Sequence, residues 1–148
     1  MSQPHQDDLA RACTVVALPP GIVVRAWNDS DYPAVRDLAT IEGWTTLRDR
    51  PDDGRRAWQN SWPALVATHD DEVIGFLRGL TDGAVTLYVA DLLVAPAWRG
   101  RGVATALLDV CHALYPTARF DLLSTGMAHA FYKQLGFRAF QGFRKSYV

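Results

Sequence analysis

The sequence predicts a single α+β (α/β) domain in which about four helices flank a mixed, mostly antiparallel sheet of six to seven strands. Three observations predict this fold class. The chain has 148 residues and a mass of 16.4 kDa, which is the size of one domain. Short β-branched and apolar segments separated by turn residues fill much of residues 22–94. After Pro96 the apolar residues take up helical spacing, so helices are expected to cover the sheet.

The first part of the chain predicts a strand, two helices and an antiparallel meander. Residues 28–31 supply helix-capping side chains ahead of Pro33, so a helix is expected to run to about Ile41. A shorter helix is expected over residues 51–61. Turn residues then separate the strands of the meander. The strands expected in this part are 22–27, 63–68, 73–80 and 84–94.

The last strand of that set is apolar on both faces, and Asp91 is its only charge, so it should lie in the centre of the sheet. A helix is expected from near Gly102 to just before Pro116, because proline ends a helix. A short strand, a helix closed by Gly136 and an aromatic-rich final strand or hairpin should follow. Their expected ranges are 119–123, 127–135 and 137–148.

Residues 1–20 are expected to form an N-terminal extension, because the Pro-Pro-Gly at 19–21 breaks any regular element, and residues 21–148 a single domain. No apolar run approaches the roughly 20 residues of a membrane span, and the first residues lack the basic start of a signal peptide. We therefore expect a cytoplasmic protein with no membrane partner. Cys13 and Cys111 are too few for a disulfide framework or a zinc site, so no metal is expected.

The net charge of −1 hides an uneven distribution. From Trp98 onward seven basic residues stand against two acidic ones, a net charge of +5, and the first 97 residues carry a net charge of −6. If the two parts meet at a cleft, one side suits an anionic ligand and the other a cationic one. Ordinary surface charge is the alternative. The total charge indicates no nucleic-acid partner.

Residues 94–105 carry the most informative pattern, a strand end followed by a glycine loop that opens a helix. Unpaired N–H groups at a helix start, together with the helix dipole, favour a phosphate group. A P-loop is excluded because no Gly-Lys-Ser/Thr follows. A dinucleotide-binding loop is disfavoured because Thr105 stands at the third glycine position and little chain remains, although Asp121 lies where a ribose-binding acid would. The third family with such a loop binds acetyl-CoA.

Arg99, Gly102 and Ala104 match the loop Arg/Gln-x-x-Gly-x-Gly/Ala, and residues 130–137 match a Phe/Leu-Tyr-x-x-x-Gly-Phe block. With these motifs in this order, the sequence resembles the GCN5-related N-acetyltransferase (GNAT) superfamily. The resemblance extends over residues 22–148 and is strongest over 91–137. It implies the GNAT fold and an enzyme that transfers an acetyl group from acetyl-CoA to an amine by direct attack in a ternary complex.

The resemblance also implies how acetyl-CoA is held. The backbone N–H groups of residues 99–105 would bind its pyrophosphate, and Val94 would offer its backbone to the pantetheine arm and the thioester oxygen. The cofactor-binding residues implied in this way are Leu92, Leu93, Val94, Arg99, Gly100, Arg101, Gly102, Val103, Ala104, Thr105 and Tyr132.

Acetyl transfer to an amine needs a base and an acid. A free alkylamine has a pKa of about 10.4 and must lose a proton before it attacks, and a departing thiolate with a pKa of about 8.5 leaves better when protonated. Tyr132 matches the family's tyrosine that protonates the sulfur; a packed aromatic ring is the alternative. Many members of the family carry an asparagine seven residues before this tyrosine, where this chain has Thr125.

Two carboxylates are candidates for the base. Asp91 lies in the central strand, from which it could reach the amine directly or through water; the alternative is a structural carboxylate bonded to backbone. Glu42, at the end of the first helix after the strand 22–27, is the second candidate. We expect His129 to be either a surface histidine or one whose hydrogen bonds are satisfied within the fold, with no catalytic role.

The acceptor side of the site is expected near the tryptophans that precede the meander. Trp44, together with Asp91, is the expected substrate contact, and nearby acids could attract a cationic amine with an apolar body. Core packing is the alternative for these rings. The tryptophans are Trp44, Trp58 and Trp62, and the acids are Glu42, Asp49, Asp52 and Asp53.

The leading hypothesis for function is therefore an acetyl-CoA-dependent N-acetyltransferase that acts on a primary amine of a small molecule. A protein or peptide N-acetyltransferase and a catalytically inactive CoA-binding regulatory module are the alternatives. The resemblance also implies a homodimer formed through the last strands, where Phe140, Phe143 and Tyr147 would supply apolar contacts.

Overall fold

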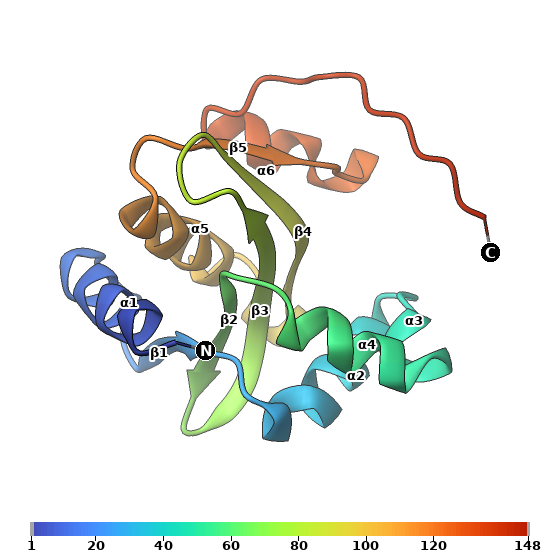
Figure 1. Ribbon diagram of the computed structural model, residues 1–148, viewed down its shortest axis with the longest axis horizontal. Coiled ribbons are helices and arrows are strands. Elements are labelled where there is room, and N and C mark those ends of the chain that lie inside the picture. The colour runs from blue at the N-terminus through green and yellow to red at the C-terminus, as the bar shows by residue number, and fades with distance from the viewer. Residues whose placement is uncertain (1, 148) are drawn as a thin grey trace.

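The computed structural model describes residues 2–147, and in them five strands form one sheet in the order β1-β2-β3-β4-β5 (Figure 1). The first four strands pair antiparallel, and β4 pairs parallel with β5. The expected α+β class with a mixed, mostly antiparallel sheet is confirmed, with five strands in place of six to seven. The strands are β1 (Ile22–Ala26), β2 (Ala64–His69), β3 (Glu72–Thr81), β4 (Thr86–Val94) and β5 (Arg119–Leu122).

The helices cover the sheet on both faces (Figure 1). One face packs against α1 and α5, and the other against α2 and α4, since alternate residues of β2 enter the two cores: Leu65 the first, Ala64 the second. A short α6 follows β5. The helices are α1 (Gln3–Val15), α2 (Tyr32–Ile41), α3 (Thr46–Asp49), α4 (Pro51–Gln59), α5 (Val103–Leu114) and α6 (His129–Gln134).

Helix α1 lies inside the stretch expected to be an N-terminal extension, and it packs as part of the domain. Leu9 and Ala12 are buried in the same core as α5 and β1. His5 stacks on the ring of Trp62 with centroids 4.4 Å apart, and Trp62 Nε1 donates a hydrogen bond of 2.7 Å to Tyr115 Oη. The Pro-Pro-Gly break at 19–21 therefore separates α1 from β1 without separating it from the core.

The central position expected for β4 is confirmed. Leu87 and Val89 enter the core shared with α1 and α5, and Leu93 enters the core shared with α2 and α4. The face changes along the strand because the β3–β4 register shifts between Arg78 and Gly79. Before the shift Leu87 and Val89 face the core of α1 and α5, and after it Val94 faces that core while Leu93 faces the other.

The parallel pairing of β4 with β5 covers half of β4. The paired residues run from Thr86 opposite Arg119 to Val89 opposite Leu122, where the pairing ends. Residues 90–94 of β4 continue with no partner from β5 in the described chain. The two strands thus separate, and the gap between them opens toward the loop that follows Val94.

The expected final strand or hairpin at 137–148 is wrong for residues 137–147, which form no strand; residue 148 lies outside the described residues. This segment runs away from the body of the domain (Figure 1). Phe140, Phe143 and Tyr147 are exposed. Aromatic residues favour strands, but a strand also needs a neighbour to pair with, and the sequence pattern does not supply that partner.

Within residues 2–147, the helices are all too short, or too polar, to cross a bilayer.

Candidate active site

The glycine loop between β4 and α5 presents a row of unpaired backbone donors. Gly100 and Gly102 adopt left-handed φ values of +74° and +84°, which side chains with a Cβ rarely tolerate. Arg99 N–H still bonds to Pro96 O, and Ala106 N–H bonds to Gly102 O. Between them, the six N–H groups of residues 100–105 make no hydrogen bond within the described chain. With the positive end of the α5 dipole behind them, these donors fit a phosphate group.

The gap beside β4 adjoins this loop. Ala95 N–H bonds to Ile74 O of β3, and backbone groups alternate along a strand, so Leu93 also turns its backbone to β3. Leu92 and Val94 therefore turn theirs toward the gap. Val94 O accepts a hydrogen bond of 3.1 Å from Arg99 Nε, which connects the gap to the loop.

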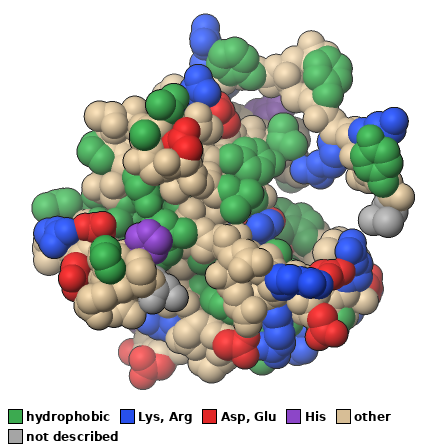
Figure 2. Space-filling view, viewed as in Figure 1, with side chains coloured by type: hydrophobic (Ala, Val, Ile, Leu, Met, Phe, Trp, Pro, Cys, Tyr) green, Lys and Arg blue, Asp and Glu red, His purple; other side chains and the backbone are tan. Residues whose placement is uncertain are grey.

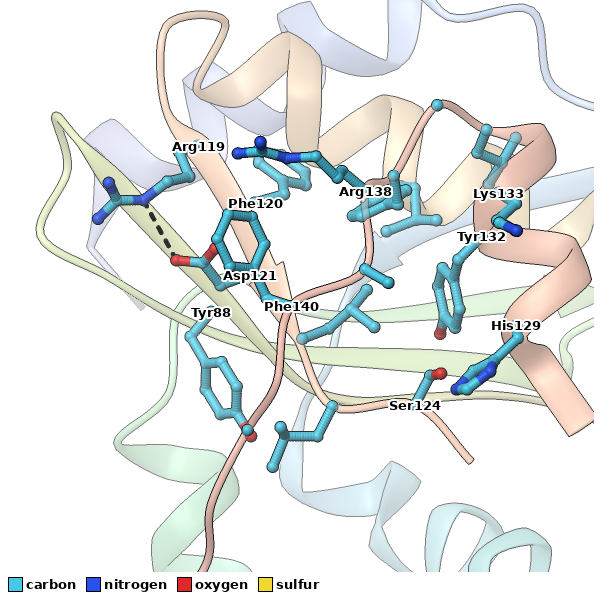
Figure 3. Close-up of a pocket in the computed structure, with 18 of the residues that line it drawn as sticks. Tyr88, Arg119, Phe120, Asp121, Ser124, His129, Tyr132, Lys133, Arg138 and Phe140 are labelled. Carbon is cyan, nitrogen blue, oxygen red and sulfur yellow. Dashed lines mark ion pairs between the residues drawn. The ribbon is translucent and has the colours of Figure 1, made fainter. Parts of the chain in front are cut away.

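Tyr132 reaches the gap from α6. Its ring packs edge-on between Phe131 and Phe137, with centroids 5.1 and 5.4 Å away. Its side chain points toward the end of β5, near Ser124 (Figure 3). Burial raises the pKa of Tyr132, so the hydroxyl keeps its proton at neutral pH. The packed-ring interpretation and the proton-donor interpretation are therefore both compatible with its position.

Asp91 forms an ion pair that the sequence did not reveal. Its Oδ2 accepts a hydrogen bond of 2.5 Å from Nε of Arg78, the residue opposite it on β3. Arg78 Nη1 also donates to Ser61 Oγ at 3.2 Å. The expected alternative for Asp91, a carboxylate bonded to backbone, has no such bond in the described chain. Arg78 went unnoticed because nothing in the local pattern distinguishes it from a surface arginine.

Glu42, the second candidate base, lies at the C-terminal end of α2 and forms an ion pair with Arg99 of the glycine loop. The two residues are far apart in sequence, so the pair joins the acceptor-side helix α2 to the loop. Arg99 holds one carboxylate oxygen of Glu42, as Arg78 holds one of Asp91, so ion pairing alone does not separate the two candidates for the base.

A cleft of about 890 Å³ lies between the α2–α4 side and the opening of β4 and β5; we call it the acceptor cleft. Trp44, Asp91 and Tyr132 all line it, so the structure brings these three expected site residues together. Leu92 lines it as well, and so do residues 142–144 of the C-terminal segment 137–147, which we call the tail. Figure 2 shows the hollow beneath the tail, with arginine and lysine side chains nearby.

Two of the three tryptophans expected near the acceptor pack elsewhere. Trp58 is 1% exposed and packs edge-on against Phe76 in the core. Trp62 is held by His5, as described above. Trp44 is 39% exposed, and of the three tryptophans it alone lines the acceptor cleft.

The acids expected to attract a cation are mostly neutralised. Arg48 pairs with Asp49 at 2.8 Å, and Asp53 pairs with both Arg50 and Arg56. These arginines, Arg50 first, hold the pKa of Asp53 below its usual range. With Glu42 also paired to Arg99, a cation would meet few available carboxylates on this side.

A second, larger cleft of about 1340 Å³ lies between β5, α5, α6 and the start of the tail (Figure 3). Its wall is largely apolar, with Phe120 and Phe140 among the lining residues, and Arg119 pairs with Asp121 at its edge at 3.2 Å. His129 is exposed, which matches the surface alternative. Among residues 2–147, no three His, Cys, Asp or Glu side chains gather as a metal site.

A sheet that opens beside β4, next to a loop suited to a phosphate group, is the arrangement expected of an acetyltransferase. A family comparison agrees. Residues 60–139 match the model described as Acetyltransferase (GNAT) domain. The match covers more than half of the chain. The protein therefore belongs to the GNAT acetyltransferase family.

Solved structures show the same fold. A candidate GNAT-family acetyltransferase from Xanthomonas campestris pv. campestris is 28% identical with a TM-score of 0.70, and the match covers 88% of this chain and 96% of that chain. A candidate acetyltransferase from Deinococcus radiodurans R1 is 21% identical with a TM-score of 0.68, covering 89% and 92%. An aminoglycoside acetyltransferase from an uncultured soil metagenomic sample is 22% identical with a TM-score of 0.64, covering 86% and 97%. A comparison with curated proteins finds no match.

Proposed function

We propose that this protein is an acetyl-CoA-dependent N-acetyltransferase that acts on a primary amine of a small molecule. The observation that carries the proposal is the row of unpaired N–H groups at 100–105, placed where β4 and β5 separate. A pyrophosphate bound to these donors leaves the gap free for the arm that follows it. Acetyl-CoA, when bound there, supplies the acetyl thioester.

Backbone groups would hold the arm of this cosubstrate. Leu92 and Val94 turn their backbone toward the gap, whereas Leu93 pairs with β3, so we assign the contacts to the first two. The loop contacts are assigned to residues 100–105, with Arg99 and Arg101 adding positive charge at their edge.

Tyr132 is proposed as the acid. In the reaction the amine nitrogen forms a bond to the thioester carbonyl carbon, the C–S bond breaks and the sulfur leaves with the electron pair. Tyr132 gives its hydroxyl proton to that sulfur and is reprotonated from solvent. Its raised pKa keeps the proton available for this step.

Asp91 is proposed as the group that removes the proton of the amine, directly or through a water molecule. Arg78 occupies Oδ2, and Oδ1 makes no hydrogen bond within the described chain, so one oxygen remains to accept. The proton passes from the nitrogen to this oxygen and then to solvent. Asp91 lies on the same strand as Val94, which puts it within reach of the thioester end of the gap.

The test of the proposed function has two parts. Acetyl-CoA should raise the melting temperature, because a ligand that binds the folded state stabilises it. Thiol release should then follow when acetyl-CoA is mixed with one or more amines of a small-molecule panel. Turnover confined to peptide amines would favour a protein acetyltransferase, and binding with no turnover would favour a regulatory module.

A matched pair of variants tests the loop. Gly100 and Gly83 have similar φ values, +74° and +79°, and a Cβ at either would meet no neighbour. Gly100→Ala and Gly83→Ala should therefore cost similar stability, about 1 kcal/mol each. Only Gly100→Ala should weaken acetyl-CoA binding, because Gly83 lies in the turn between β3 and β4. Equal affinity in both variants contradicts the assigned loop.

We also propose a homodimer formed through the tail. Phe140, Phe143 and Tyr147 are 78%, 87% and 84% exposed, and β5 has an outer edge with no partner in the described residues. Exposed aromatic residues beside an unpaired sheet edge favour burial against a second copy of the chain.

A further inference from the structure

The charged side chains of the acceptor cleft favour an anion over a simple cation. Three arginines and two aspartates line it: Arg50, Arg78, Arg144, Asp53 and Asp91. Each aspartate is already paired with an arginine. Within the described chain the cleft therefore holds no aspartate or glutamate without an arginine partner, and its cations outnumber its acids. An amine that carries only a positive charge would find each of these carboxylates already partly neutralised by an arginine.

Arg78 is the cation best placed to bind a ligand. Its side chain is 19% exposed and lines the cleft on the same face as Asp91. Nε donates to Asp91 and Nη1 to Ser61, so two bonds fix the plane of the guanidinium. Nη2 makes no hydrogen bond within the described chain. A fixed, partly buried guanidinium with donors left over loses little entropy when it binds a carboxylate.

The partner of Arg78 offers the complementary group. Asp91 Oδ2 is used by Arg78, and Oδ1 has no partner within residues 2–147. The pair therefore exposes a donor edge on one side and an acceptor oxygen on the other. Trp44 stands in the same cleft as an apolar wall for the carbon skeleton between them.

We infer that the acetyl acceptor is a primary amine that also carries a carboxylate, with the carboxylate bound by Arg78 and the amine directed to Asp91 Oδ1. Arg78 is then the residue that sets specificity for an amino-acid-like acceptor. This inference rests on the proposed function, because it assigns the substrate class of the same cleft. It replaces the cationic amine that the acidic composition of the first part of the chain had indicated.

Equilibrium binding tests the inference without requiring turnover. Ligands are titrated calorimetrically in matched pairs. Each pair consists of an amino acid and the amine that remains when its carboxylate is removed, such as phenylalanine with phenethylamine or lysine with cadaverine. ω-Amino acids of increasing length, paired with n-alkylamines, vary the spacing of the two groups. Titrations are done with and without saturating CoA. The wild type should bind at least one carboxylated ligand about 10- to 100-fold more tightly than its partner, the range of a hydrogen bond to a charged group.

Variants assign the preference to Arg78. Arg78→Gln should abolish it, and Arg78→Lys, which keeps the charge but loses the fork, should retain part of it. Arg36→Gln is the matched control: Arg36 also pairs with a neighbouring aspartate, but on the surface of α2 outside the cleft, so the preference should be unchanged. CoA-dependent stabilisation of each variant confirms that it is folded.

Several outcomes would overturn the inference. The first is a wild type that binds every carboxylated ligand no more tightly than its matched amine. The second is a preference for carboxylated ligands that survives in Arg78→Gln, including the case in which Arg144→Gln removes it. Failure of the proposed function looks different. If CoA does not bind or no amine yields free thiol, the enzyme assignment fails, while the titrations without CoA still report whether Arg78 selects carboxylates.

Discussion

Arg99 of the glycine loop pairs with Glu42 at the C-terminal end of α2, and the same arginine donates through Nε to Val94 O at the end of β4. One side chain therefore connects the proposed phosphate loop, the proposed acyl-binding strand and the helix that borders the acceptor cleft. We therefore propose that Glu42 positions Arg99, and we prefer Asp91 for the base because it lines the acceptor cleft together with Tyr132.

Glu42→Gln distinguishes these roles. If Glu42 positions Arg99, the variant should change the KM for acetyl-CoA, and kcat should fall by less than about tenfold with an unchanged pH profile. Loss of a general base would lower kcat by about 10²- to 10⁴-fold. Steady-state kinetics across pH 6–10 make the comparison, and a large loss of kcat would return Glu42 to the catalytic role.

Tyr132→Phe should lower kcat by about 100-fold and leave the KM for acetyl-CoA nearly unchanged, because the ring packing is kept and the hydroxyl is removed. Tyr147→Phe is the control, since Tyr147 is 84% exposed in the tail. Full turnover by the Tyr132 variant would leave that ring with a packing role alone.

The pH dependence of wild-type kcat follows from the same residue. Burial raises the pKa of Tyr132 above its ordinary value of about 10, so the protonated, donating form persists to higher pH. We therefore expect no alkaline decline of kcat below about pH 10. A decline centred near pH 8 would show that another group supplies the proton.

The two cysteines should react slowly in the native protein. Burial raises the pKa of both thiols, strongly for Cys111, and the thiolate is the reactive form. An aromatic disulfide reagent at pH 8 should label the buried Cys111 only after unfolding and the half-buried Cys13 slowly in the native protein. Because the folded pKa exceeds the unfolded value of about 8.5, these groups favour folding below that pH, and the free energy of unfolding should decrease as pH rises above it. Rapid native labelling of Cys111 would contradict its burial.

Leu9→Ala tests whether α1 belongs to the domain. Leu9 is 6% exposed in the main core, so the variant should lower the free energy of unfolding by about 2–5 kcal/mol. Val15→Ala on the same helix, where the side chain is 75% exposed, should change it by less than about 0.5 kcal/mol. Denaturant titration measures both, and equal values would place α1 outside the cooperative unit.

The proposed homodimer predicts that Phe140→Ser combined with Phe143→Ser shifts the protein toward monomer in sedimentation velocity, since these exposed rings would lie in the interface. Val85→Ser is the control, because Val85 is also exposed and apolar but lies in the turn between β3 and β4. A wild type that stays monomeric at every concentration would end the dimer proposal.

The sequence by itself determined most of the fold and the location of the loop. The apolar, β-branched composition of residues 73–80 and 84–94 predicts strands from those residues alone. A loop is likewise predicted at Gly100 and Gly102, directly ahead of a helical pattern, and both glycines adopt left-handed φ values. These features are local, because periodicity and backbone preference act over a few residues. The family resemblance was visible for the same reason.

The tertiary structure decided which charges are available. Glu42 meets Arg99 through the packing of elements distant in sequence, and Asp91 meets Arg78 because the shifted register of neighbouring strands β3 and β4 sets them opposite each other, so no local pattern reveals that these acids are paired. Packing also placed α1 in the core and left residues 137–147 without a strand partner. The acidic first part of the chain was compatible with a cation site or with ordinary surface charge. Ion pairing in three dimensions leaves instead a cleft whose best-placed donor is Arg78, since the free energy of a charge depends on its partners and its exposure to solvent.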